Sequence, residues 1–114
     1  MIMNDKFLSF LGITRKSGNL YLGMDCVKDN IVKKNISLIL TTSDISEKSL
    51  EKIRKIAIEN KVELKKINYT MQDIESSVKK AAGIIGISSE NFVNKINSLI
   101  SESNNEQEDS IYDN

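Results

Sequence analysis

Apolar residues recur every three or four positions in five segments of the chain, the spacing that places them on one side of an α-helix. The predicted helices cover residues 5–16, 23–35, 44–57, 70–80 and 88–100. Asp44, with Glu47 three residues later, predicts a capping box at the start of the third helix. Gly18 follows the basic last turn of the first helix, where a glycine commonly ends a helix.

Four shorter segments between these helices favour β-strands. Residues 36–40 and 83–87 are almost continuously apolar and rich in isoleucine, as strands buried on both faces are. Residues 19–22 form a short apolar stretch, and residues 62–67 alternate only roughly, as a half-exposed strand does. Gly86, inside one of the buried strands, predicts that another element approaches the backbone closely there.

The order of these segments predicts the class of fold. Helices and strands alternate along the chain, which favours one sheet with helices packed against it. We expect an α/β fold of the three-layer α/β/α sandwich type, with helices on both faces of a small mixed sheet of about four strands. A length of 114 residues fits a single domain with its own core.

The formal net charge of zero is the sum of two unlike parts. Residues 1–100 contain all 16 lysines and arginines and 11 of the 16 acidic residues, which gives this body a net charge of +5. Residues 101–114 contain the other five acidic residues and no basic one, and only Ile111 and Tyr112 are large and apolar there. We therefore expect a folded domain over residues 1–100 and a disordered acidic tail over residues 101–114.

The composition argues against several kinds of chemistry. The chain has no histidine, so it lacks the commonest general base and metal ligand. One cysteine, Cys26, excludes an intramolecular disulfide, and a lone cysteine in a reducing compartment is usually a buried or semi-buried small hydrophobe. We expect no enzyme activity, no metal and no cofactor. No targeting segment or membrane span is visible, so we expect a cytoplasmic protein.

A cationic surface is the best candidate for function. Arg15 and Lys16 precede Gly18 and Gly23, and a predicted helix begins after Gly23. The start of a helix attracts phosphate through its dipole and its unpaired N–H groups. The cations that we expect to contact phosphate are Arg15, Lys16, Lys28 and Lys33. An ordinary solvated cationic surface is the alternative interpretation.

Three stretches in this order resemble one known family. They are LGITRKSGNLYLG (residues 11–23), ISLILTTSD (36–44) and IIGISSENF (84–92). Together they resemble the kink-turn-binding ribosomal protein family, which includes the archaeal large-subunit protein L-seven-Ae, the eukaryotic L-thirty-e and small bacterial YlxQ-like relatives. The resemblance covers residues 6–100 and is closest to the YlxQ-like group.

The resemblance implies a non-catalytic protein that binds structured, kink-turn-like RNA, with ribosomal RNA as a possible partner. In this family, the first turn of the second helix enters a widened RNA groove, and a loop before the fourth helix covers stacked or flipped-out nucleotides. The RNA-binding residues implied in this way are Gly23, Met24 and Asp25 at the helix end and Tyr69, Thr70 and Met71 in the second loop.

The chain departs from the family pattern at several positions. The family motif Asn-Glu-x-x-Lys falls on Asp25, Cys26 and Asp29, so an acid stands where the family has lysine. The common Leu-Gly beyond the second loop is Ile74-Glu75 here. An alternative therefore stays open, in which the chain is a protein-interaction module that kept the fold and lost kink-turn recognition. In both cases we expect a monomer, and protein partners remain open.

Overall fold

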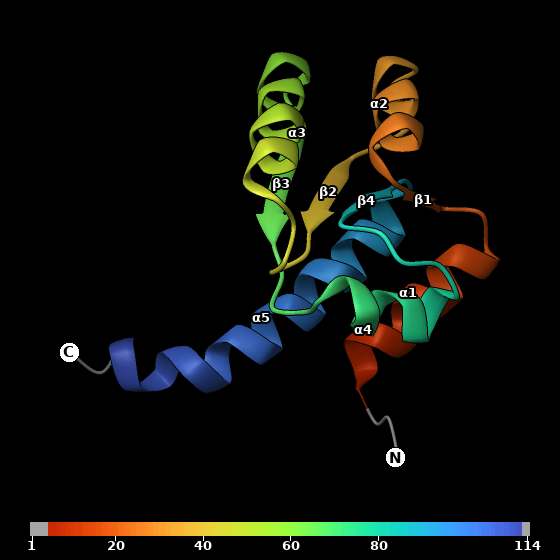
Figure 1. Ribbon diagram of the computed structural model, residues 1–114. Coiled ribbons are helices and arrows are strands. Elements are labelled where there is room, and N and C mark those ends of the chain that lie inside the picture. The colour runs from red at the N-terminus through yellow and green to blue at the C-terminus, as the bar shows by residue number, and fades with distance from the viewer. Residues whose placement is uncertain (1–4, 113–114) are drawn as a thin grey trace.

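The computed structural model describes the course of the chain from residue 5 to residue 112 and the side chains of residues 5–102. Within this part of the chain, five helices and four strands alternate in the predicted order (Figure 1). They are α1 (Lys6–Lys16), β1 (Leu20–Leu22), α2 (Met24–Val32), β2 (Leu38–Thr41), α3 (Glu47–Asn60), β3 (Glu63–Lys66), α4 (Met71–Val78), β4 (Ile84–Ile87) and α5 (Glu90–Tyr112).

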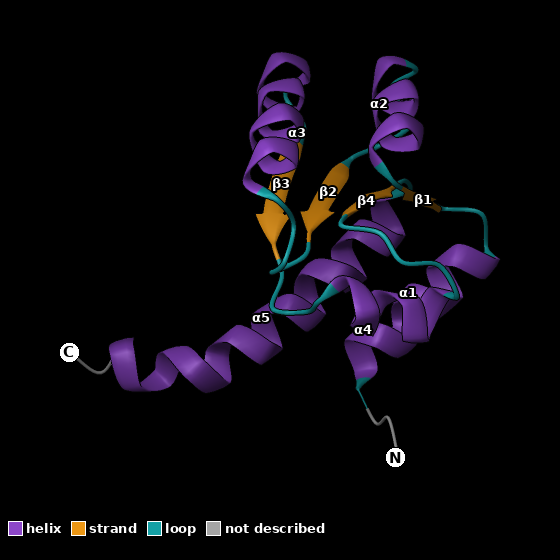
Figure 2. Cartoon of the chain, viewed as in Figure 1, coloured by secondary structure: helices purple, strands orange, loops and turns teal. Residues whose placement is uncertain are grey.

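The four strands form one sheet, which separates two layers of helices. The strand order is β1-β4-β2-β3, and β4 lies antiparallel to both β1 and β2. β2 and β3 pair in parallel, so the sheet is mixed. α2 and α3 stand side by side on one face, whereas α1, α4 and α5 cover the other (Figure 2). The predicted α/β/α sandwich with a mixed four-stranded sheet is therefore confirmed.

The core is divided in two because neighbouring residues of a strand point to opposite faces of the sheet. Leu38 and Leu40 of β2 belong to the cluster under α1, α4 and α5, while Ile39 belongs to the cluster under α2 and α3. Gly86 makes room for the second cluster, because an added Cβ would lie 2.5 Å from Cδ1 of Ile36. The close approach that this glycine predicts is confirmed.

The start of α3 differs from the prediction. Ser46 is its N-cap residue, and the Ser46 hydroxyl accepts a hydrogen bond from the N–H of Ser49 at 3.1 Å. Asp44 instead accepts a bond from the N–H of Met71, at the start of α4, at 3.0 Å. The prediction of a capping box at Asp44 is wrong because the fold brings a distant helix end within reach of this carboxylate.

α5 also differs from the prediction at its end. The sequence pattern ends this helix at Ile100, but the helix continues to Tyr112 and extends away from the sandwich (Figure 1). The division into a folded domain and a disordered acidic tail stays a prediction. No glycine follows Gly86 and the chain has no proline, so no strong helix-ending residue interrupts the segment. The last two residues of the predicted tail, 113–114, lie outside the described residues.

Among the described helices, including the 23 residues of α5, none combines the length and apolar character needed to cross a membrane.

Candidate functional site

Four loops meet at one end of the sheet. We call this end the loop edge and define it as Gly23, residues 42–46, residues 67–70 and residues 81–83. Backbone hydrogen bonds join these loops: Gly23 N to Ile84 O (2.9 Å), Thr42 N to Gly83 O (3.1 Å) and Ser43 N to Tyr69 O (2.8 Å). Because β1, β2 and β3 all end here, α2, α3 and α4 all begin here, so three helix N-termini share one edge of the molecule (Figure 1).

α2 is the one helix of α1–α4 that begins without a side-chain cap. Side chains of Asp5, Ser46 and Thr70 cap α1, α3 and α4, whereas Gly23 offers no such group to α2. Gly23 has φ 96° and ψ 156°, a conformation that is essentially restricted to glycine. No atom lies within 4 Å of the position of an added Cβ at Gly23, so the space beside it is open. The first N–H groups of α2 are therefore available to an acceptor on a ligand.

The exposed side of α2 carries both signs of charge. Asp25, Lys28 and Asp29 are exposed, and the two acids lie four residues apart on one face of the helix. Met24 is half-buried and packs against the core cluster under α2 and α3. The start of α2 can thus accept hydrogen bonds through Asp25 and donate them through its N–H groups, but its second turn presents a carboxylate to any anion.

Cys26 is exposed, which contradicts the prediction of a buried or semi-buried cysteine. Val27 and Ile31, four residues apart, take the buried face of α2 and leave Cys26 on the solvent side. The side-chain amide of Asn30 donates a hydrogen bond to the Cys26 carbonyl at 2.8 Å. The Cys26 side chain therefore belongs to the surface around the start of α2.

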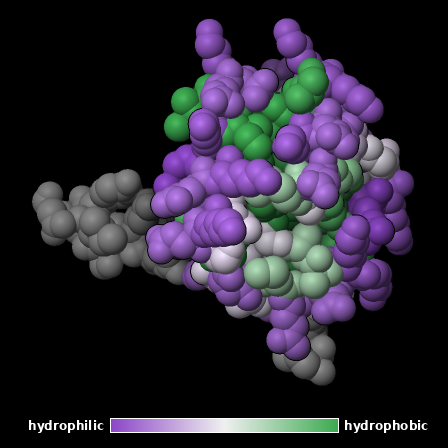
Figure 3. All heavy atoms as spheres, turned by 45° about the horizontal axis from the view of Figure 1, so that its top comes forward, coloured by the Kyte–Doolittle hydropathy of each residue, from purple (hydrophilic) through white to green (hydrophobic). Residues whose placement is uncertain are grey.

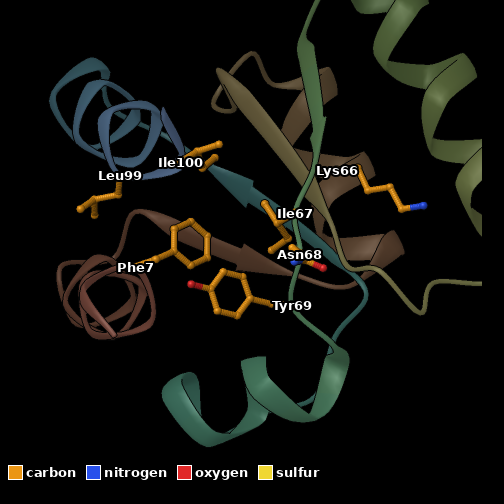
Figure 4. A pocket seen from close by; sticks show the side chains of 7 residues that line it. All are labelled: Phe7, Lys66, Ile67, Asn68, Tyr69, Leu99 and Ile100. Atoms are coloured by element: carbon orange, nitrogen blue, oxygen red, sulfur yellow. The ribbon is translucent and has the colours of Figure 1, made fainter. Parts of the chain in front are cut away.

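Tyr69 of the predicted second loop packs inward. Its ring stacks on Phe7 with ring centroids 4.8 Å apart, and its hydroxyl donates a hydrogen bond to Asp5 at 2.6 Å. The two rings form part of a small apolar pocket that Leu99 and Ile100 close from α5 (Figure 4). Burial, and then the Asp5 carboxylate, raise the pKa of the Tyr69 phenol far above its usual value. The contacts of Tyr69 thus join the β3–α4 loop to the start of α1.

Thr70 and Met71 also anchor the second loop. The Thr70 hydroxyl accepts a bond from the N–H of Asp73 at 3.1 Å, and the Asp73 carboxylate accepts one from the N–H of Thr70 at 2.9 Å. This reciprocal capping box starts α4. Met71 is half-buried, and its Cε would lie 3.5 Å from a Cβ added at Gly83. These residues position the loop edge, and they offer less free surface than the start of α2.

Tyr69→Phe is expected to lower the free energy of unfolding by about 1–2 kcal/mol at neutral pH, because it removes a hydrogen bond to a charged group. The raised pKa in the folded state means that the unfolded state loses this proton first, from pH ~10 upward. The stability difference between the wild type and Tyr69→Phe should therefore be full below that pH and shrink above it. Urea unfolding at about pH 7 and about pH 11 measures this difference, with Tyr21→Phe as the matched loss of a hydroxyl. If the stability difference between the wild type and Tyr69→Phe were the same at about pH 7 and about pH 11, the raised pKa of Tyr69 would be contradicted.

Arg15 and Lys16 lie at the end of α1, beside the end of α4. The Arg15 guanidinium donates a hydrogen bond to the carbonyl of Val78, the last residue of α4. Lys79 and Lys80 follow Val78 directly and begin the loop that runs to Gly83 on the loop edge. The sequence gives no sign that these two lysines lie beside Arg15, because residues 15 and 79 are distant in the chain and local patterns carry no information on their contact.

The structure brings some of the predicted site residues together and separates others. Gly23, Met24, Asp25 and Lys28 share the first turns of α2. Lys33 is the C-cap of the same helix, about 14 Å from its start at 1.5 Å per residue, so it lies at the opposite end. Among residues 5–102 no group of three or more His, Cys, Asp or Glu side chains is arranged to hold a metal ion. The geometry therefore offers hydrogen-bond donors, acceptors and cations for binding.

No protein-family model matches the sequence, and a search of curated proteins also gives no match. Many solved structures match the fold, and two of them are described next. The chain shares its fold with both. One is a protein of unknown function from Bacillus halodurans C, with a TM-score of 0.78 and 21% sequence identity over 86% of this chain and 99% of the other. The second is the 15.5kD RNA binding protein of Giardia lamblia, with a TM-score of 0.68 and 8% identity over 89% of this chain and 90% of the other.

Proposed function

We propose that the protein binds structured RNA at the loop edge and that the start of α2 enters the RNA. The observation that carries this proposal is the open, uncapped N-terminus of α2 behind Gly23. Distorted RNA presents phosphates and base edges that such a helix end can contact with its N–H groups. The fold supports the same class of ligand, because the Giardia protein that shares it is named as an RNA binding protein.

The predicted RNA-binding residues at and near the loop edge have different roles in this proposal. Asp25 accepts hydrogen bonds from guanine N–H groups at the base edges, and Met24 gives apolar contact beside it. Arg15, Lys16 and Lys28 neutralise phosphates. The second loop, with Tyr69, Thr70 and Met71, covers nucleotides next to the helix end. The RNA that we propose as the partner is kink-turn-like, and ribosomal RNA is its source. The protein binds this RNA without catalysis.

A protein-interaction module on the same fold is the second candidate. Val32 and Ile58 are both 71% exposed, and they lie near the ends of α2 and α3 that face away from the loop edge. Hydrophobic atoms are visible on the surface in this region, among hydrophilic side chains (Figure 3). The carboxylates of Asp25 and Asp29 also weaken attraction to phosphate. Under this hypothesis the partner covers the far ends of α2 and α3.

Gel-shift titrations with a kink-turn RNA and a plain duplex of equal length, at several salt concentrations, test the proposal. We expect the kink-turn RNA to bind roughly tenfold more tightly than the duplex, since one base-reading contact is worth ~1–3 kcal/mol. Absence of binding to either RNA at low salt would refute RNA binding and favour the protein-interaction module. Equal binding to both RNAs with a steep salt dependence would reduce the interaction to nonspecific phosphate attraction and would refute structured recognition.

A further inference from the structure

α1 and α4 enclose a groove on the face of the sheet opposite α2 and α3. The groove has a volume of about 590 Å³. Small residues create it: Ser9 and Gly12 of α1 face Ser77 of α4, and a Cβ added at Gly12 would lie 3.5 Å from the Ser77 carbonyl oxygen. Three cations also line this groove, namely Arg15, Lys16 and Lys79. The groove thus combines hydroxyl and backbone polar groups with positive charge.

The charge of this surface comes from segments without acidic residues. Residues 6–24 and 76–89 contain five lysines and arginines and no aspartate or glutamate. The hydrogen bond from Arg15 to the Val78 carbonyl fixes this guanidinium at the negative end of the α4 dipole. The first two turns of α2 carry Asp25 and Asp29, so their surface is less positive. Attraction for phosphate is therefore stronger at the α1–α4 groove than along α2.

A short segment of the chain connects the groove with the loop edge. Residues 79–83 run from the groove lining at Lys79 to Gly83, whose carbonyl accepts the bond from Thr42 on the loop edge. Five residues span at most ~17 Å, so a few nucleotides of an extended strand can follow the same course. We propose that the α1–α4 groove binds the sugar-phosphate backbone of an unpaired strand that continues from the structured RNA. This inference rests on the proposed function and adds a second part to the same binding surface.

The chemistry of the lining determines what the groove recognises. Lys16 and Lys79 neutralise phosphates, and the hydroxyl of Ser9 hydrogen-bonds phosphate oxygens or ribose 2′-hydroxyls. No aromatic side chain lines the groove among the described residues, so it offers no platform for stacking bases. The groove therefore holds the strand independently of its base sequence, and the start of α2 supplies the selectivity.

Two RNAs test this inference: the kink-turn RNA alone, and the same RNA with an unpaired extension of about six nucleotides on either end, a length that one small domain covers. For the wild type we expect the extension to increase affinity at least ~5-fold near 0.1 M salt, the gain from about one phosphate contact on a single strand. Lys79→Asn keeps a residue that tolerates the positive φ of 68° and removes the charge. Ser9→Glu adds a repulsive charge to the groove. Both variants should abolish the gain and leave the affinity for the RNA without extension unchanged.

Lys61→Asn is the matched control, because Lys61 is also a left-handed C-cap lysine but belongs to α3 on the opposite face of the sheet. It should keep the gain from the extension. Loss of the gain in this control, persistence of the gain in Lys79→Asn and Ser9→Glu, or absence of a gain in the wild type would overturn the groove assignment. In those cases binding of the RNA without extension would leave the proposed function intact. Failure of both RNAs to bind the wild type would overturn the two proposals together.

Discussion

Combining Cys26→Glu with Asp29→Lys is expected to tighten the binding of a kink-turn RNA roughly 100-fold. The two changes introduce the glutamate and lysine that the kink-turn family, which this sequence resembles, carries at the corresponding motif positions. Each base-reading pair is worth ~1–3 kcal/mol, and two such pairs give about 3 kcal/mol. Both residues are exposed on the first turns of α2, outside the buried face of Val27 and Ile31, so the fold should tolerate the exchange.

The control for this double variant must carry the same change in charge elsewhere. Glu51→Lys with Ile58→Glu also raises the net charge by one and uses exposed positions of α3. Nonspecific attraction to RNA would tighten binding in both double variants and for a plain duplex as well. Recognition through α2 would tighten binding only in the α2 variant and only for the kink-turn RNA. An unchanged affinity of the α2 variant, measured by titration, would mean that RNA docks away from this helix.

Most of the fold could be predicted because it depends on patterns that are local in the chain. The apolar spacing of residues 50–57 specifies which face of α3 is buried, and Ile53 and Ala57 are buried as expected. Gly18 ends α1 with φ 84°, as a glycine in this position commonly does. The alternation of such segments then leaves few possible architectures, which explains why the three-layer sandwich followed from the sequence.

The errors arise where contacts between distant residues decide the outcome. Asp44 had a suitable local partner in Glu47, but the folded chain gives its carboxylate the N–H of Met71. The local pattern around Tyr69 likewise gives no sign that its ring stacks on Phe7, 62 positions earlier in the chain. Lys79 was missed for the same reason, because only the packing of α4 against α1 brings it to the groove beside Lys16. Local periodicity carries no information on such contacts.

Gly23→Ala is expected to destabilise the protein by about 1–3 kcal/mol, although no atom obstructs the new methyl group. The cost comes from the backbone, since φ 96° with ψ 156° is unfavourable for any residue with a Cβ. Gly12→Ala is the matched control, because it is expected to raise the free energy of unfolding rather than lower it. Gly12 lies inside α1, where an added Cβ makes only ordinary contacts and alanine favours the helix by ~0.5–1 kcal/mol. Urea unfolding of both variants measures the two effects.

The same substitution links stability to function, because Gly23 sets the position from which α2 begins. If the backbone relaxes to avoid the strain, the bond from Gly23 to Ile84 shifts and the uncapped N–H groups of α2 turn away from their present direction. RNA affinity should then fall, and the free energy of unfolding should decrease by less than the full strain of the backbone. If the backbone does not relax, the free energy of unfolding should decrease by the full strain and the RNA affinity should stay unchanged. A variant with wild-type stability and wild-type RNA affinity would exclude both outcomes and would show that the conformation of Gly23 is not required at this helix end.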